Sequence, residues 1–205
     1  MFNDKYGLTD AVLQGRKTMT RRVVGSRMTD DDIKAYLKGY TELAYKAAPY
    51  YIGEVVAVAQ SYSSFRPLIS HNDDYSPSHP GWSNKMFVRA DLMPHRIRIT
   101  DIKVERLQDI SDEDCLKEGI IPITWRQHLP QAIDDLSPQK YIDHNVYSLE
   151  KFREGIEDCW AESDPNEYMA EEAKTAFAVL IFKTLGRKVW ESNPFVFAYT
   201  FELVK

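Results

Sequence analysis

Segment 96–107 constrains the fold of this chain most, because its apolar residues change sides partway along a regular strand pattern. The first apolar residues, Ile97 and Ile99, lie at odd positions. The next two, Ile102 and Val104, lie at even positions, and Leu107 lies at an odd position again. A strand that changes parity without a break usually contains β-bulges, and bulges allow a sheet to bend into a small barrel. We therefore expect a curved, bulged sheet.

The remaining pattern predicts helices and strands in mixed order. Apolar spacings of three and four, with capping residues, predict helices over residues 9–14, 30–48, 111–118 and 167–185. Alternation and β-branched residues predict strands over residues 18–24, 52–59, 86–88, 96–107 and 195–203. The last strand is expected to put one row of residues on a single face: Phe195, Phe197, Tyr199, Phe201 and Leu203. We expect a loop over 61–83 and an irregular segment over 121–165, with its best helical piece at 149–160. The predicted fold class is α+β, a small bulged β-barrel decorated with helices.

Composition favours one soluble domain, alone or with insertions. The chain has 205 residues, 43% hydrophobic and 12% aromatic, which is enough for a full core and excludes disordered and fibrous proteins. The longest apolar run, Ala176 to Phe182, is too short to span a membrane, and the first residues lack an export signal. With only two cysteines, Cys115 and Cys159, we expect a cytoplasmic protein with reduced thiols and no membrane partner.

The charge is unevenly distributed. A net charge of −5 excludes a protein that coats nucleic acid over its whole surface. Residues 11–28, however, contain cations and no acid, and the sequence GRKTMTRR at 15–22 gathers four cations and two hydroxyls at a helix-to-strand turn. Arginine forks bind phosphate or carboxylate, and a lysine among cations can act as a base toward a hydroxyl. The alternative is a solvated surface strand after a helix C-terminus.

Within this turn, Lys17 and Thr20 are the candidate base and hydroxyl. Their separation of three places them on opposite faces of a regular strand, so they converge only where a turn or bulge resets the parity. Glu118 is the third candidate, at the end of the predicted helix 111–118, where the helix dipole disfavours a carboxylate unless a cation such as Lys17 is nearby. An exposed glutamate on an acidic helix is the alternative.

Other groups give weaker signals. Metal-capable side chains in the 61–83 loop lack a ligand spacing, so we expect no metal there: His71, Asp73, Asp74 and His79. Three aromatic residues could stack a base beside the basic turn or simply form core: Tyr62, Tyr75 and Trp82. Cys115 is interpreted as a small buried residue. The sequence contains no glycine-rich phosphate-binding loop, so we expect no cofactor.

Four motifs in order resemble the ASCH family, which belongs to the PUA-like β-barrel superfamily. The GRKTMTRR turn at 15–22 is similar to the opening signature of that family. Segment 51–58, YIGEVVAV, resembles its Gly-acidic-hydrophobic strand, and segment 96–119, especially residues 104–115, resembles its strand followed by a Ser-acidic-acidic helix ending in Glu-Gly. Segment 190–202 resembles its closing strand. The first and third motifs together are fairly specific, and the match is to versions found in phage and prophage genomes.

The resemblance implies a PUA-like barrel with a cleft near the first helix that binds RNA or nucleotides. Small bacterial relatives are amidohydrolases that deacetylate N4-acetylcytidine with a Lys, a Thr and a Glu, which match Lys17, Thr20 and Glu118. In that scheme Lys17 takes a proton from Thr20, Thr20 attacks the amide carbonyl, and Glu118 protonates the leaving amine. Binding of the nucleotide is assigned to the arginines of the turn, Arg16, Arg21 and Arg22, with Tyr62 as a stacking residue.

The chain is about twice as long as those small hydrolases. The resemblance therefore implies a single ASCH/PUA-like domain over 1–205 with insertions near 25–50, 61–83 and 121–165. Three functions remain open at this point: binding of nucleic acid or a modified nucleotide, hydrolysis of an acylated nucleoside, and binding of a host protein through the insertions.

Overall fold

The computed structural model describes residues 2–65, 78–128, 141–149 and 170–204. The chain divides into two compact units, residues 1–104 with 197–205 and residues 105–196, which we describe separately. Helices and strands are mixed along the sequence, and this confirms the predicted α+β class.

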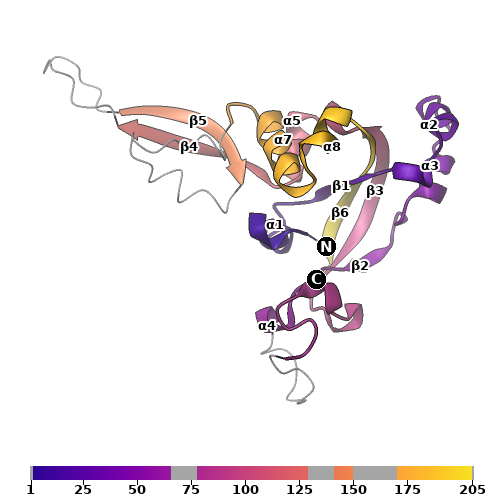
Figure 1. Ribbon diagram of the computed structural model, residues 1–205, viewed down its shortest axis with the longest axis horizontal. Helices are drawn as coiled ribbons and strands as arrows, with labels where there is room; N and C mark the ends of the chain where they lie inside the picture. The colour runs from indigo at the N-terminus through magenta and orange to yellow at the C-terminus, as the bar shows by residue number, and fades with distance from the viewer. Residues whose placement is uncertain (1, 66–77, 129–140, 150–169, 205) are drawn as a thin grey trace, which may run out of the picture. The chain divides into compact units, whose positions relative to one another are not determined.

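The first unit is built on a curled antiparallel half-barrel sheet. Its four strands are β1 (Met19–Val23), β2 (Val55–Ala57), β3 (Arg96–Arg106) and β6 (Phe195–Val204), arranged in the order β1-β6-β3-β2. Figure 1 shows the yellow β6 between β1 and β3. The strand β2 pairs with β3 in the register Val56↔Ile97.

Strand β3 changes parity as predicted. Four apolar side chains are at most 5% exposed: Ile97, Ile99, Ile102 and Val104. Thr100 and Asp101 between them are both exposed, so two neighbours in the strand interrupt the alternation. The curl of the sheet and this interruption agree with the expectation of a bent strand.

Strand β6 differs from the prediction of one apolar face. Val196, Phe197, Ala198 and Tyr199 are consecutive and all at most 1% exposed. Phe197, Tyr199 and Phe201 of the predicted row are buried, and the difference is that Val196 and Ala198, which have the other parity, are buried as well.

The expected glycine follows the end of helix α1 (Leu8–Leu13), and helix α2 (Asp30–Leu37) begins at its expected capping residue, whereas α1 begins one residue before the expected Thr9. Helix α1 is followed by Gly15 at φ +73°, a left-handed position that favours glycine. Helix α2 starts with a capping box between Thr29 and Asp32.

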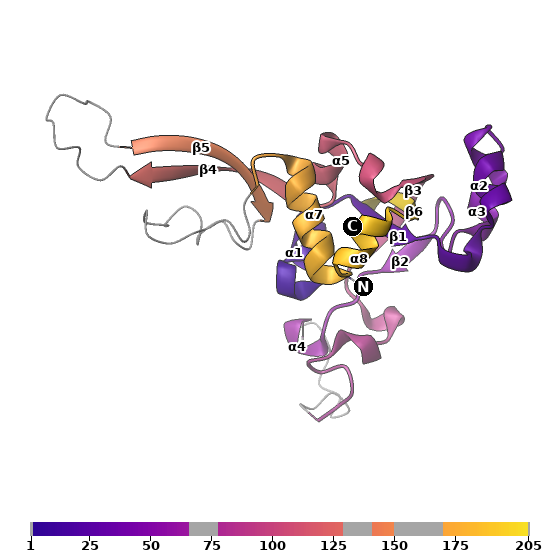
Figure 2. The same cartoon turned by 45° about the horizontal axis from the view of Figure 1, so that its top comes forward.

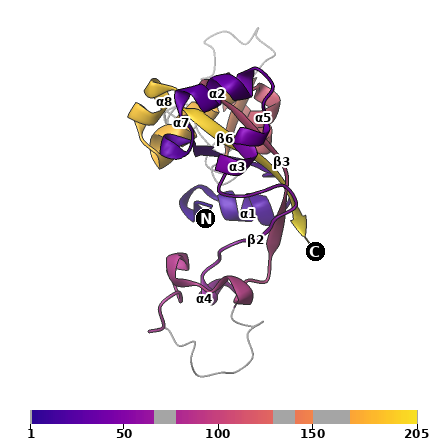
Figure 3. The same cartoon turned by 90° about the vertical axis from the view of Figure 1, so that its right-hand side faces the viewer.

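The predicted single helix over 30–48 is wrong. Gly39, at φ +101°, ends α2, and a separate helix α3 (Glu42–Ala47) follows. Figure 3 shows α2 and α3 as two short helices that lie side by side. The apolar period continues across the break, so the spacing alone did not reveal the glycine stop.

The rest of the first unit contains short helices. Three residues at the amino end and three near β1 form 3-10 turns, η1 (Asp4–Tyr6) and η2 (Gly25–Arg27). After β2 come α4 (Tyr62–Phe65), η4 (Lys85–Phe87) and η5 (Ala90–Leu92). The strand predicted at 86–88 is wrong, because the side chain of Asn84 accepts a hydrogen bond from the amide of Met86 and caps η4 instead.

Among its described residues, the second unit contains a hairpin and four helical segments. These are η6 (Leu107–Asp109), α5 (Asp112–Lys117), β4 (Ile120–His128), β5 (Tyr141–Leu149), α7 (Ala173–Thr184) and α8 (Arg187–Ser192). Figure 2 shows the long antiparallel pair β4–β5, whose register runs from Ile120↔Leu149 to His128↔Tyr141.

The prediction of an irregular segment from 121 onward is therefore wrong for the hairpin residues. Pro122 lies inside β4 opposite Tyr147, whose amide and carbonyl bond to Ala170, so this pair requires no amide hydrogen from residue 122. The helical piece predicted at 149–160 falls outside the described residues from 150 onward. Helix α7 confirms the predicted helix 167–185 over Ala173–Thr184, whereas Ala170 forms a β-bridge with Tyr147 instead.

In the part of the chain that the structure describes, no helix combines the length and the apolar character that a membrane crossing requires.

Candidate functional site

A small cavity of about 50 Å³ lies on one face of the sheet in the first unit. All four strands contribute to it, together with the N-terminal segment and the chain before β2. Its lining consists of Phe2, Thr20, Arg22, Tyr50, Val56, Ala57, Ala59, Ile97, Ile99 and Tyr199. Ile97, Ile99 and Tyr199 are buried, whereas Arg22 is exposed, so the cavity has an apolar inner wall and a cationic rim.

The inner wall contains an unusual polar atom. The hydroxyl of Tyr199 is buried and has no hydrogen-bond partner among the described residues. The ring packs edge-on against Tyr50 at 5.6 Å between centroids. Burial raises the pKa of Tyr199 to about 12, and the nearby Tyr50 amide and the charges of Arg27 and Arg22 oppose this shift only in part. A buried hydroxyl without a partner is energetically disfavoured, so this atom is expected to cost stability.

The parity of β1 separates the residues of the basic turn into two groups. Thr20 and Arg22 line the cavity. Lys17, Met19 and Arg21 share the other parity and are buried, and one guanidinium nitrogen of Arg21 lies 3.2 Å from the sulfur of Met19. Of the three arginines assigned to nucleotide binding, only Arg22 lines the cavity, and its side chain is exposed.

Lys17 nevertheless lies close to a residue of the cavity wall. Its side chain is 2% exposed, and its Nζ atom is 5.9 Å from the ring centroid of Phe2, which lines the cavity. Lysine is almost never fully buried without specific interactions. The alternative of a solvated surface lysine is therefore excluded by this burial.

Glu118 follows α5 directly, as predicted, and is 4% exposed. Its amide donates a 2.9 Å hydrogen bond to the carbonyl of Asp114 at the helix end. The alternative of an exposed glutamate is thus wrong. Glu118 belongs to the second unit and Lys17 and Thr20 to the first, so the meeting of the three side chains stays a prediction.

The structure does not support Tyr62 as a stacking residue. Its ring is fully buried in a cluster with Phe65 and Met93, and its hydroxyl accepts a hydrogen bond from the amide of Arg89 at 2.9 Å. A covered ring has no face on which a base could stack, and Tyr62 is therefore a core residue.

The remaining candidates lie apart from the cavity lining. The guanidinium of Arg16 donates two hydrogen bonds to the side-chain oxygen of Gln14, at 3.0 and 2.9 Å. Cys115 is fully buried, as predicted. Three residues of the weak metal signal and one aromatic candidate lie outside the described residues: His71, Asp73, Asp74 and Tyr75. No group of three or more metal-ligating side chains occurs among the residues that are described.

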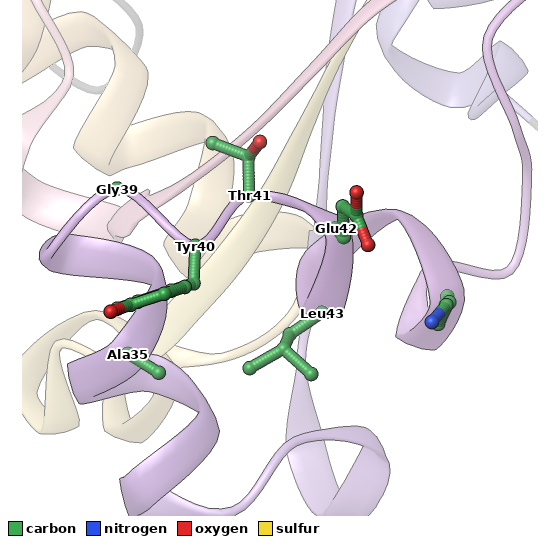
Figure 4. Close-up of a pocket in the computed structure, with 7 residues that line it drawn as sticks. Ala35, Gly39, Tyr40, Thr41, Glu42 and Leu43 are labelled. Carbon is green, nitrogen blue, oxygen red and sulfur yellow. The ribbon is translucent and has the colours of Figure 1, made fainter.

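A larger hollow of about 550 Å³ lies between α2 and α3. Figure 4 shows the ring of Tyr40 over Ala35, with Leu43 on the adjoining helix. Tyr40 is 67% exposed, and Glu42 and Lys46 are also exposed. A ligand there would meet side chains that already contact water, so we place the candidate site in the smaller cavity.

Of the cavity lining, only Thr20 and Arg22 were proposed as site residues from the sequence, and the aromatic residues Phe2, Tyr50 and Tyr199 were missed. A signal existed for Tyr199, which carries a hydroxyl in the otherwise apolar row of the last strand. Phe2 and Tyr50 lie outside every motif and reach the cavity only through the fold.

Comparisons with known proteins found no match among protein-family models, curated proteins or solved structures.

Proposed function

We propose that this chain is an ASCH-type module with a PUA-like barrel, and that it binds a modified nucleotide or a short RNA at the cavity beside β1. The observation that carries the proposal is the joint presence of Thr20 and the exposed Arg22 in the lining of one cavity. The residue types fit a ligand with an anionic part at Arg22 and an uncharged polar part inside.

The charges favour a local contact over a broad nucleic-acid surface. The whole chain is acidic, with a net charge of −5. Arg22 is exposed at the rim, and the positive charges of Arg22 and Arg27 both act to lower the pKa of Tyr199. Such a site can bind a ligand with one or two phosphates, whereas a ligand with many phosphates would require a basic face.

Binding is tested by titrating short RNAs and cytidine nucleotides at several salt concentrations. We expect affinity that falls as salt rises, and a smaller salt slope in Arg22→Ala than in the wild type, because one phosphate contact is lost. Arg98→Ala is the matched control, since Arg98 is an exposed arginine of the same sheet that pairs with Glu202 at 3.0 Å. Salt-independent or undetectable binding at low ionic strength would contradict the proposal.

Amide hydrolysis is the second candidate, and the burial of two charged side chains favours it. Lys17 and Glu118 are 2% and 4% exposed, which is unusual for residues without a specific role. In the proposed reaction Lys17 accepts the hydroxyl proton of Thr20, and Thr20 Oγ forms a bond to the acyl carbon. The C–N bond breaks as Glu118 protonates the amine, and water then hydrolyses the ester on Thr20.

Hydrolysis is tested by incubating the protein with N4-acetylcytidine and following the release of cytidine. Lys17→Ala and Thr20→Ala are each expected to lower turnover by at least about 100-fold, since each removes a group that acts in the transition state. Thr100→Ala removes an exposed threonine of β3 and serves as the control. Turnover that survives Thr20→Ala would rule out this mechanism.

A further inference from the structure

The cavity beside β1 is smaller than the base of the ligand that we propose for it. One water-sized probe needs roughly 10 to 15 Å³, so a cavity of about 50 Å³ holds roughly four such units. A nucleobase with its whole ring system is larger than that. Part of the lining must therefore move before a base can enter, and in this respect the inference rests on the proposed function.

Phe2 is the lining residue whose backbone is least firmly held. Seven of the ten lining residues lie on β1, β2, β3 and β6, which are paired in the sheet. Phe2 instead belongs to the N-terminal segment 2–5, in which residues 3–5 are exposed. The next buried side chain is that of Tyr6, which is 6% exposed. A segment with few buried contacts opens at a low free-energy cost.

The ring of Phe2 lies on the side of β6 that faces the cavity. It packs against the ring of Phe201 at 5.6 Å between centroids. Phe201 and Tyr199 are two residues apart on β6 and point to the same side of the strand, and Tyr199 lines the cavity. The Nζ atom of Lys17 lies 5.9 Å from the centroid of the Phe2 ring. Removal of this ring would therefore extend the cavity along β6.

Lys85 fixes the segment 2–5 to the rest of the first unit. Its side chain is 14% exposed, and its Nζ atom lies 2.7 Å from the carboxylate of Asp4 and 3.0 Å from the hydroxyl of Thr9. The same ammonium donates a hydrogen bond to the carbonyl of Phe2. Thr9 belongs to α1, so one largely buried cation joins the segment to the first helix. Hydrogen bonds of charged groups are strong, so the contacts of Lys85 set how often the segment opens.

We propose that Phe2 is a removable plug of the candidate site and that Lys85 is its latch. In the closed state the ring of Phe2 occupies the place of a base. When the contacts of Lys85 break, the segment 2–5 moves away and a nucleotide enters with its phosphate at Arg22. A ligand that binds only the open state has its affinity reduced by the fraction of protein that is open.

The first test needs no nucleotide. The protein is labelled with 4-fluorophenylalanine, the ¹⁹F signal of Phe2 is identified by its absence in Phe2→Leu, and its shift between H₂O and D₂O reports the exposure of the ring. In Lys85→Met this solvent shift is expected to approach that of Phe87, which is 60% exposed. Lys34→Met is the matched control, because the pair of Lys34 with Asp31 is exposed. A Phe2 ring as shielded in Lys85→Met as in the wild type would overturn the latch.

The second test measures competition between the plug and a ligand. Cytidine 5′-monophosphate is titrated by calorimetry into the wild type, Phe2→Ala and Lys85→Met. Both variants are expected to bind it about tenfold more tightly, because a larger fraction of the protein is open. Phe87→Ala removes an exposed phenylalanine and is expected to bind as the wild type does. Unchanged or weaker binding by Phe2→Ala would show that the ring belongs to the binding wall and would overturn the plug.

The two tests separate the possible failures. Equal nucleotide binding by the wild type and Phe2→Ala overturns the plug and leaves the proposed function intact. Absence of nucleotide binding by the wild type and by both variants overturns the proposed function, and the fluorine signal of Lys85→Met still decides whether the segment 2–5 opens.

Discussion

The unpartnered phenol of Tyr199 gives the stability of this protein a predictable dependence on alkaline pH. In the unfolded chain a tyrosine loses its proton near pH 10, whereas in the folded protein the pKa of Tyr199 is raised to about 12. Between these values the folded state binds more protons than the unfolded state, so stability falls as pH rises. The contribution of Tyr199 is fully present below pH 10 and is lost on passing pH 12.

The magnitude follows from the two pKa values. At pH 11 the unfolded phenol is largely ionised and the folded one is not, which lowers the free energy of unfolding by about 1.4 kcal/mol. Over the whole window the loss approaches about 2.7 kcal/mol. In Tyr199→Phe this loss is absent, and at pH 8 the variant is expected to be at least as stable as the wild type because an unpaired buried hydroxyl is removed.

The assay is urea denaturation of both proteins at several values between pH 8 and pH 11. The other ionisable groups act equally in both, so the difference between the two unfolding free energies isolates Tyr199. We expect this difference to be constant up to about pH 9 and then to increase in favour of Tyr199→Phe. Parallel pH profiles would refute the assignment of a buried, destabilised phenolate.

Two further predictions concern packing and the N-terminal segment, and both are measured by urea denaturation. A Cβ at Gly81 would lie 2.7 Å from Cε2 of Tyr62, whereas one at Gly39 would meet nothing within 4 Å. Both glycines have positive φ, so Gly39→Ala should lose about 1 to 2 kcal/mol and Gly81→Ala about 1 to 3 kcal/mol more. Equal losses would show that the ring moves aside freely. Lys85, whose side chain is 14% exposed, contacts Asp4 at 2.7 Å and hydrogen-bonds to the carbonyl of Phe2. Lys85→Met is expected to lose about 1 to 2 kcal/mol, whereas the control Lys34→Met, in an exposed pair, should lose less than about 0.5 kcal/mol. A loss no larger than that of the control would mean that Lys85 does not fasten the N-terminal segment.

Local signals in the sequence predicted the features that depend on neighbouring residues. Thr29 with Asp32 and Ser111 with Asp114 marked the starts of α2 and α5, because a capping side chain acts within one helical turn. The parity change in β3 was also visible in the sequence. Successive side chains of a strand point to opposite faces, so the positions of the apolar residues indicate which face is buried.

Features that depend on distant partners were not predictable in this way. The hairpin β4–β5 is stabilised by pairing across a connecting segment, and Pro122 concealed its strand character. The cavity unites Phe2, Tyr50 and Tyr199, which are far apart in the sequence. Thr20 and Arg22 were found because they belong to a dense basic motif, whereas Tyr199 resembles any other core aromatic until its hydroxyl is seen to lack a partner.

The strand order of the sheet also governs the sequence of events during folding. Strand β6 occupies the place between β1 and β3, although it follows β3 by about ninety residues and β1 by more. Until β6 is available, β1 has no neighbour in the sheet and the cavity lacks the wall that Tyr199 provides. Closing such long loops is slow, so we infer that the nascent chain must keep β1 soluble through its charged residues, Arg21 and Arg22, before the sheet is completed.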